Sequence, residues 1–231
     1  AMTADYARFI EDYLGEKYRE ARRLVKEVAP HQLVSFRMQH TGDPTYRGPS
    51  MIPYPAEAFV DAVDIFEPEA YGRIGNWERI RPGYFTAAYL RALNPNLPVF
   101  WAEIGQSCWS VSEGEATDEG KERVARFYED FHKMLIGSHA NGVAFWWYPG
   151  GYRVNEKSDY GVINPDGTDR PVTQVIREWG AKFRESGPVP EPNSWLEIPR
   201  EWTPGGIVGK YDRVQEQYWN LIDQGNEVGL R

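Results

Sequence analysis

Short apolar segments alternate with amphipathic helical segments along most of the chain, and this alternation constrains the fold more than any other feature. Helices that separate near-continuous apolar strands are typical of a parallel sheet with the helices packed outside it. We therefore expect an α/β fold with four parallel strands over residues 3–185. The expected strands cover 33–38, 64–66, 98–104 and 143–147, and the expected helices cover 5–28, 55–63, 82–93, 117–139 and 171–184.

Residues 186–231 do not continue the alternation of strands and helices. Residues 186–204 form a proline-rich linker, and an amphipathic helix is expected at about 211–223. We expect residues 186–231 to pack on the α/β unit as this linker and short helix. Gly15 could split the first long helix in two.

Composition excludes several kinds of partner. The 231 residues are 41% hydrophobic and 26% charged, as in a globular protein. A net charge of −8 argues against nucleic acid or an anionic membrane, and no apolar run reaches the ~20 residues of a membrane span. The single cysteine, Cys108, rules out an internal disulfide framework, and no spacing of histidines and carboxylates suits a metal. We predict no metal and no cofactor.

Carboxylates and aromatic rings follow the predicted strands. In parallel α/β architectures, ligands bind beyond the carboxyl ends of the strands. A set of carboxylates surrounded by aromatic rings suits glycoside chemistry, because carboxylates attack or protonate while aromatic faces hold the sugar. The residues at these ends are Gln39 after the first strand, Glu67, Glu69 and Tyr71 after the second, Glu103 in the third, and Trp146, Trp147 and Tyr148 at the fourth.

Two of the strands resemble a known family. Residues 98–105 (PVFWAEIG) are similar to the seventh strand of the clan A glycoside hydrolases, which carries the nucleophilic glutamate of a retaining mechanism. Residues 141–148 (NGVAFWWY) resemble their eighth strand, which ends in a tryptophan that forms the base of the −1 sugar subsite. Residues 159–172 resemble the segment that follows in galactosidase- and cellulase-like members. The resemblance implies strands five to eight, the carboxy-terminal half of a (β/α)8 TIM barrel.

The resemblance also implies residue roles. Glu103 would be the nucleophile of a glycoside hydrolase that acts on β-linked saccharides by double displacement. The acid/base would be Glu69 or a group from a partner, because the family's Asn-Glu pair at the end of strand four has no counterpart upstream of residue 31. The carbohydrate would contact an aromatic and polar set: Arg37, Gln39, Tyr71, Trp101, Trp146, Trp147 and Tyr148.

These assignments have structural alternatives. Glu103 shares a strand face with Trp101 and could be a buried carboxylate paired with Arg37 for structure alone. Trp146 and Trp147 have opposite parity, so one would face the barrel interior and the other the helices. For the chain as a whole, the alternatives to an enzyme are a non-catalytic carbohydrate-binding or assembly module and an inactive fragment.

A half-barrel has two unpaired sheet edges and an open interior. Two copies could close into a homodimeric barrel about a two-fold axis, a complementary half could come from another chain, or local elements could cover the edges. In the closed dimer, the partner's Tyr148 or the partner's Glu156 would approach the acid/base position.

Overall fold

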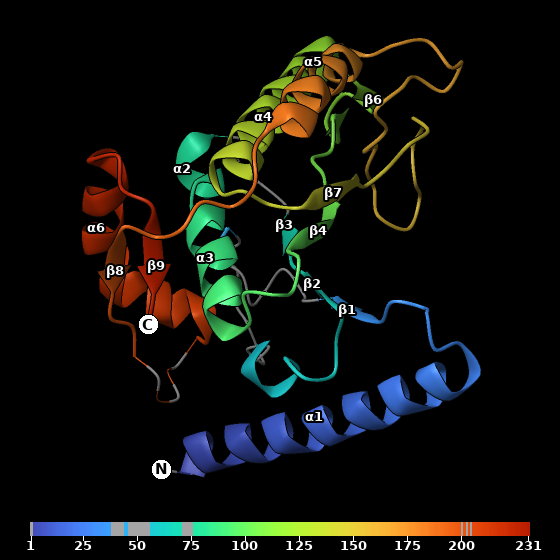
Figure 1. The fold of residues 1–231 in the computed structure, drawn as a ribbon. Coiled ribbons are helices and arrows are strands. Elements are labelled where there is room, and N and C mark those ends of the chain that lie inside the picture. The colour runs from blue at the N-terminus through green and yellow to red at the C-terminus, as the bar shows by residue number, and fades with distance from the viewer. Residues whose placement is uncertain are drawn as a thin grey trace.

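The sheet is parallel and follows the predicted strand order (Figure 1). The computed structural model describes residues 2–37, 44–45, 56–70, 76–199, 201, 203 and 205–231. β1 (Ser35–Arg37) pairs with β2 (Ile65–Glu67). β4 (Phe100–Ile104) lies between β3 (Glu69–Ala70) and β7 (Gly142–Phe145) and pairs with both. The fold is therefore α/β with parallel strands, as the sequence predicts.

β2 forms at the second predicted strand, and Pro68 separates it from β3, which the sequence analysis did not predict. Proline has no N–H to donate to the ladder, and the two strands pair with different neighbours. A bridge between Phe66 and Val99 still joins β2 to the strand that becomes β4, and Ala102 N donates to Pro68 O at 3.0 Å. Among the described residues, no strand pairs with the outer edge of β1 or of β7, so the sheet does not close into a barrel.

Helices α3 (Gly83–Leu93), α4 (Asp118–Gly137) and α5 (Pro171–Glu185) form close to the predicted positions. α4 begins after Thr117, whose side chain accepts a hydrogen bond from Gly120 N as an N-cap. α2 (Trp77–Ile80) is an additional short turn of helix. The helix predicted over 55–63 is reduced, in its described part, to a 3-10 turn, η2 (Ala56–Ala58).

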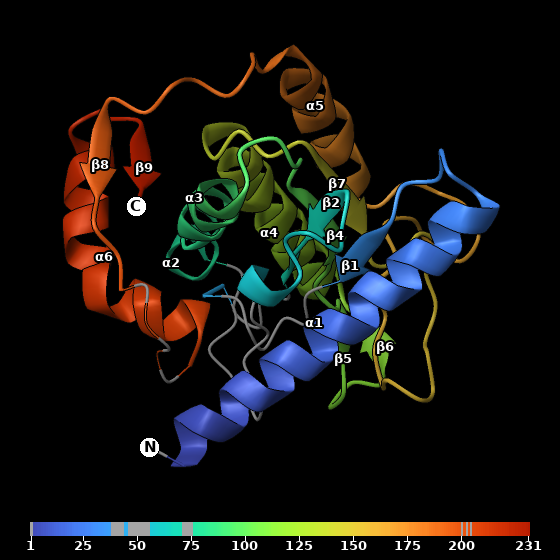
Figure 2. The same ribbon diagram turned by 60° about the horizontal axis from the view of Figure 1, so that its bottom comes forward.

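The first helix, α1 (Met2–Val28), is continuous, so the predicted break at Gly15 is wrong. A Cβ at Gly15 would lie 2.8 Å from Ala58 O, so this glycine lets α1 approach the η2 backbone. Tyr18 packs edge-on against Phe36 of β1 and against Phe59. These contacts place α1 beside the β1 end of the sheet (Figures 1 and 2).

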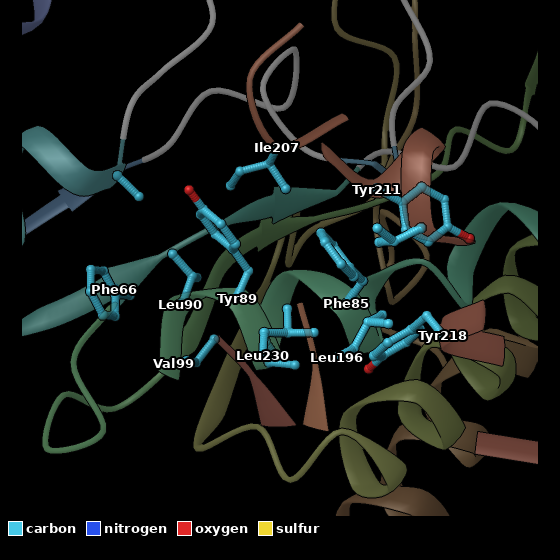
Figure 3. Packing of buried hydrophobic residues seen from close by; sticks show 14 of the residues in the cluster. Phe66, Phe85, Tyr89, Leu90, Val99, Leu196, Ile207, Tyr211, Tyr218 and Leu230 are labelled. Carbon is cyan, nitrogen blue, oxygen red and sulfur yellow. The ribbon is translucent and has the colours of Figure 1, made fainter. Parts of the chain in front are cut away.

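The C-terminal segment adds a parallel strand pair that the sequence analysis did not predict. β8 (Ser194–Leu196) pairs with β9 (Val228–Leu230), and α6 (Ile207–Asp223) connects them. Tyr211 and Tyr218 of α6 pack against Phe85 of α3, with Leu196 and Leu230 in the same core cluster (Figure 3). A short antiparallel pair, β5 (Trp109–Ser110) with β6 (Glu115–Ala116), precedes α4.

No helix within the described ranges combines the length and the apolar character that a membrane crossing needs.

Asp64 ties α1 to the sheet. Its carboxylate lies 2.5 Å from Arg22 Nη2 and 2.8 Å from Lys26 Nζ, and it accepts a hydrogen bond of 2.9 Å from Val34 N. Burial alone raises the pKa of this carboxyl, but the hydrogen bonds from Lys26, Val34 and Arg22 outweigh it and lower the pKa to about 2. The ionised form is therefore stabilised in the folded state.

We predict that Asp64→Asn lowers the free energy of unfolding by about 1 kcal/mol at neutral pH. Because the folded-state pKa is depressed, this contribution is present above the unfolded pKa of about 3.9 and is lost as the pH falls toward about 2. Urea unfolding of the two proteins at several pH values measures it. Asp61→Asn, which breaks the more exposed pair with Arg19, is the control and should change little. Equal losses in both variants would contradict the assignment.

Candidate active site

Arg37 and two glutamates meet at the carboxyl end of the sheet. Arg37 ends β1, and its Nε lies 2.5 Å from Glu69 Oε1, while its Nη1 donates to Glu103 Oε2. Glu69 and Glu103 stand opposite each other in the register of β3 and β4. Their Cα positions are therefore neighbours, about 4.8 Å apart. The sequence analysis gave pairing of Arg37 with Glu103 as one alternative, and the structure contains that ion pair.

The three side chains differ in burial. The Glu69 side chain is 4% exposed and that of Glu103 is 14% exposed, whereas Arg37 is 57% exposed. Arg37 therefore covers the carboxylates on the side that faces water. A guanidinium ion stabilises the charged form of carboxylates beside it, and one guanidinium offsets part of the repulsion between two of them.

A bulge in β4 separates Glu103 from Trp101. Trp101 pairs with Val143 and Ile104 pairs with Phe145, so Ala102 and Glu103 of β4 lie opposite the single residue Ala144 of β7. The extra residue changes the order in which successive side chains of β4 point to the two faces of the sheet. As a result, Trp101 and Ile104, which are three positions apart, are both fully buried. The expectation that Trp101 shares a face with Glu103 and binds substrate is corrected: its ring packs edge-on against Phe131 of α4, with no surface left for a ligand.

Trp146 and Trp147 do not divide between two faces as their parity predicts. β7 ends at Phe145, so the alternation of a strand no longer applies to them. The two rings lie 5.2 Å apart, and the Arg153 guanidinium carbon lies 4.8 Å from one ring centre and 4.7 Å from the other. The peptide bond between them is cis. Trp147 is 37% exposed and Tyr148 is 68% exposed, so aromatic surface faces solvent here.

The tryptophan pair adjoins the strand that carries Glu103. Trp146 N donates to Ile104 O at 2.7 Å. A Cβ on Gly105 would lie 2.3 Å from Trp146 O, so only glycine allows the ends of β4 and β7 to approach this closely. A second aromatic pair, Trp109 with Tyr152 at 4.3 Å, comes from the segments that follow the same two strands. The sequence analysis did not select it, although its position after the strand ends is the same signal.

A buried ion pair holds the segment that carries these rings. Arg170 Nη2 lies 2.7 Å from Asp159 Oδ2, and its Nη1 donates to Asp159 Oδ1 and to Gly161 O. Asp159 also accepts hydrogen bonds from Gly151 N and Gly161 N. Burial raises the pKa of Asp159, but the hydrogen bonds from Arg170 and from the two backbone N–H groups outweigh it and lower the pKa. Cys108 accepts from Arg170 Nη1 and is a buried thiol within this network.

The other predicted positions lie at the end of β2 or outside the described residues. Gln39 and Tyr71 lie outside the described residues. Glu67 is aligned with Arg37 in the register of β1 and β2. Within the described part of the chain, no group of three or more histidine, cysteine or acidic side chains could hold a metal ion.

We predict that Asp159→Asn costs about 3–5 kcal/mol of stability, because it leaves the buried Arg170 charge without its partner. Since the Asp159 pKa is depressed in the folded state, the stabilisation is complete above the unfolded pKa of about 3.9 and falls away below it. Thermal unfolding and limited proteolysis of residues 148–170 report the effect.

The matched control is Asp169→Asn, which breaks an exposed pair with Arg177 on the same segment and should cost less than about 1 kcal/mol. Similar losses in both variants would show that burial of the Asp159–Arg170 pair has no special importance.

Comparison with known proteins gives structural matches only. No protein-family model and no curated protein sequence matches the chain. A GH5_18 variant from Streptomyces cattleya in complex with Manβ1-4GlcNAc is similar with a TM-score of 0.64 and 16% identity, over 94% of this chain and 55% of that chain. The exo-β-1,4-mannosidase Op5Man5 from Opitutaceae bacterium strain TAV5 has the same TM-score and identity, over 94% and 42% of the two chains.

A polyextremophilic β-galactosidase from the Antarctic haloarchaeon Halorubrum lacusprofundi is similar with a TM-score of 0.67 and 14% identity, over 97% of this chain and 35% of that chain. The chain thus spans about half the length, or less, of these proteins. At these identities the likeness concerns the fold. The chain has the fold of part of a TIM barrel like those of the compared proteins, with parallel strands and outer helices, and its described residues do not form a closed barrel.

Proposed function

We propose that the chain carries the nucleophile side of a retaining glycoside hydrolase site for β-linked saccharides. The observation that supports this most directly is the pair Glu69 and Glu103, held by Arg37 at the carboxyl end of the sheet, beside solvent-exposed aromatic rings. A carboxylate that can attack, next to aromatic rings that can hold a sugar, is what the nucleophile side of a glycoside hydrolase site needs.

Glu103 is the proposed nucleophile. In the first step its carboxylate would attack the anomeric carbon, the glycosidic C–O bond would break, and the departing oxygen would take a proton from an acid. Water would then displace Glu103 from the glycosyl intermediate and regenerate the carboxylate. Attack requires the ionised form, and the Arg37 guanidinium at Glu103 Oε2 stabilises that form.

The acid/base role fits Glu69 less well. A general acid must reach the departing oxygen of the substrate, whereas the Glu69 side chain is only 4% exposed and its Oε1 lies 2.5 Å from Arg37 Nε. Of the two assignments that the sequence leaves open, this contact favours an acid from another polypeptide segment. Glu69 would then hold Arg37 in place and would be a positioning residue.

The compared structures support the substrate class. The GH5_18 variant is in complex with Manβ1-4GlcNAc, and Op5Man5 and the haloarchaeal protein are named as a β-1,4-mannosidase and a β-galactosidase. The bound disaccharide of the first protein and the names of the other two each specify a β linkage. We therefore propose a β-linked saccharide as the substrate of this chain, in contact with Trp146, Trp147 and Tyr148.

The test uses a fluorosugar with a dinitrophenyl leaving group, which departs without an acid. We predict that 2,4-dinitrophenyl 2-deoxy-2-fluoro-β-mannoside labels Glu103, detected by mass spectrometry of the proteolysed protein. Glu103→Gln should abolish the label, and hydrolysis of aryl β-glycosides should fall by at least about 100-fold. Glu67→Gln, which changes a glutamate on the neighbouring strand, is the control and should keep the label. A label on a different carboxylate would contradict the assignment of Glu103.

A second candidate function is carbohydrate binding without turnover. Exposed aromatic surface favours it, because Trp147, Tyr148 and Tyr152 present their rings to solvent whether or not an acid is present. Sugar binding that is unaffected by Glu103→Gln, with no hydrolysis and no label, would support this function over the enzyme.

We also propose that parallel strands from a second copy complete the sheet. The supporting observations are the outer edges of β1 and β7, which pair with no described strand, and the apolar side chains on the first half of α1. Met2, Phe9 and Tyr13 are 84%, 61% and 48% exposed, and apolar patches of this kind are usually covered by a partner.

Sedimentation velocity tests the completion by a second copy. We expect a dimer that Phe9→Lys weakens by at least about tenfold in dissociation constant, because the charge would be buried at the interface. Val111→Lys, at an even more exposed apolar position on the β5–β6 turn, is the control and should leave the dimer intact. A monomer at all concentrations would rule out self-completion.

A further inference from the structure

A cavity lies at the opposite end of the sheet from Glu103. It has a volume of about 490 Å³ and opens between α3 and the β8–β9 pair. Pro95 and His139, which line it, come before β4 and β7, whereas Glu103 and Trp146 lie at the far ends of those strands. The volume is within the range of small-molecule sites.

Two buried nitrogen atoms of the cavity lining have no hydrogen-bond partner among the described residues: Arg91 Nη1 and His139 Nδ1. Buried polar atoms in folded proteins almost always have a partner, so the described residues leave the polar groups of these lining residues incompletely satisfied. His139 Nε2 faces Glu227 Oε2 at 3.7 Å.

An exposed tryptophan lines the same cavity. Trp195 of β8 is 51% exposed, and a Cβ on Gly229 of β9 would lie 2.7 Å from its Cζ3. The indole therefore rests against the β9 backbone, and much of its surface is left for another molecule. Such a fixed, exposed ring provides a stacking surface for the apolar face of a sugar.

The charges of the lining argue against an anionic ligand. Arg91 contributes one positive charge, and Glu191 and Glu227 contribute two negative charges. A neutral molecule with several hydroxyl groups can accept from the Arg91 guanidinium and donate to the carboxylates of Glu191 and Glu227. We propose that this cavity is a second saccharide site, which binds a neutral sugar unit stacked on Trp195. The proposal does not depend on hydrolysis at Glu103.

The experiment observes Trp195 directly by ¹⁹F NMR of the full chain labelled with 5-fluorotryptophan. Trp195→Phe assigns its resonance. The probes are the methyl β-glycosides of mannose, N-acetylglucosamine, galactose and xylose. We expect at least one of them to shift the Trp195 resonance in a saturable way, and Glu227→Ala to raise the dissociation constant by about tenfold through loss of a charged acceptor.

Trp147→Ala is the matched control, because it removes an exposed indole at the other end of the sheet and should leave the Trp195 titration unchanged. The proposal is overturned if none of the four sugars shifts the Trp195 resonance. It is also overturned if Glu227→Ala has no effect on the titration, because the sugar would then lie outside the cavity.

Discussion

The contact of one guanidinium with two carboxylates is the interaction on which the candidate site depends. Glu69 and Glu103 are neighbours in the register of β3 and β4, and two charges at this separation repel each other in a partly buried setting. Arg37 reaches both from β1, across a sheet that Pro68 interrupts. The same side chain therefore offsets the repulsion and links strands whose backbone pairing is incomplete. Removing it would take one guanidinium from two carboxylates that are largely buried, which is costlier than losing one surface ion pair.

The aromatic side of the site depends on a second ion pair. The segment between β7 and α5 has little regular secondary structure, so its backbone groups need other partners. Asp159 and Arg170 supply them, since the carboxylate accepts from two backbone N–H groups and the guanidinium donates to a backbone carbonyl. This pair fixes the segment that places Arg153 over Trp146 and Trp147. The stacking surface is thus positioned by buried polar contacts in a loop.

The sequence was sufficient for those parts of the fold that local pattern determines. Strand and helix periodicity located the sheet, and position at a strand end selected Glu103 and Glu69. It failed where pairing partners decide the geometry. The bulge that buries Trp101 arises from the register of β4 against β7, which no local pattern of β4 encodes. The β8–β9 pair joins residues more than thirty positions apart along the chain, and Trp195 becomes part of a cavity only through that pairing.

The contacts of the two carboxylates bear on the proposed reaction. Double displacement needs a carboxylate that attacks the anomeric carbon and a separate acid that protonates the departing oxygen. Arg37 contacts both Glu69 and Glu103. This arrangement agrees with the proposed attack by Glu103 and with a proton supplied by another segment. The compared proteins are about twice as long as this chain or longer, and the sheet edges at β1 and β7 are where further strands could bring an acid to the substrate.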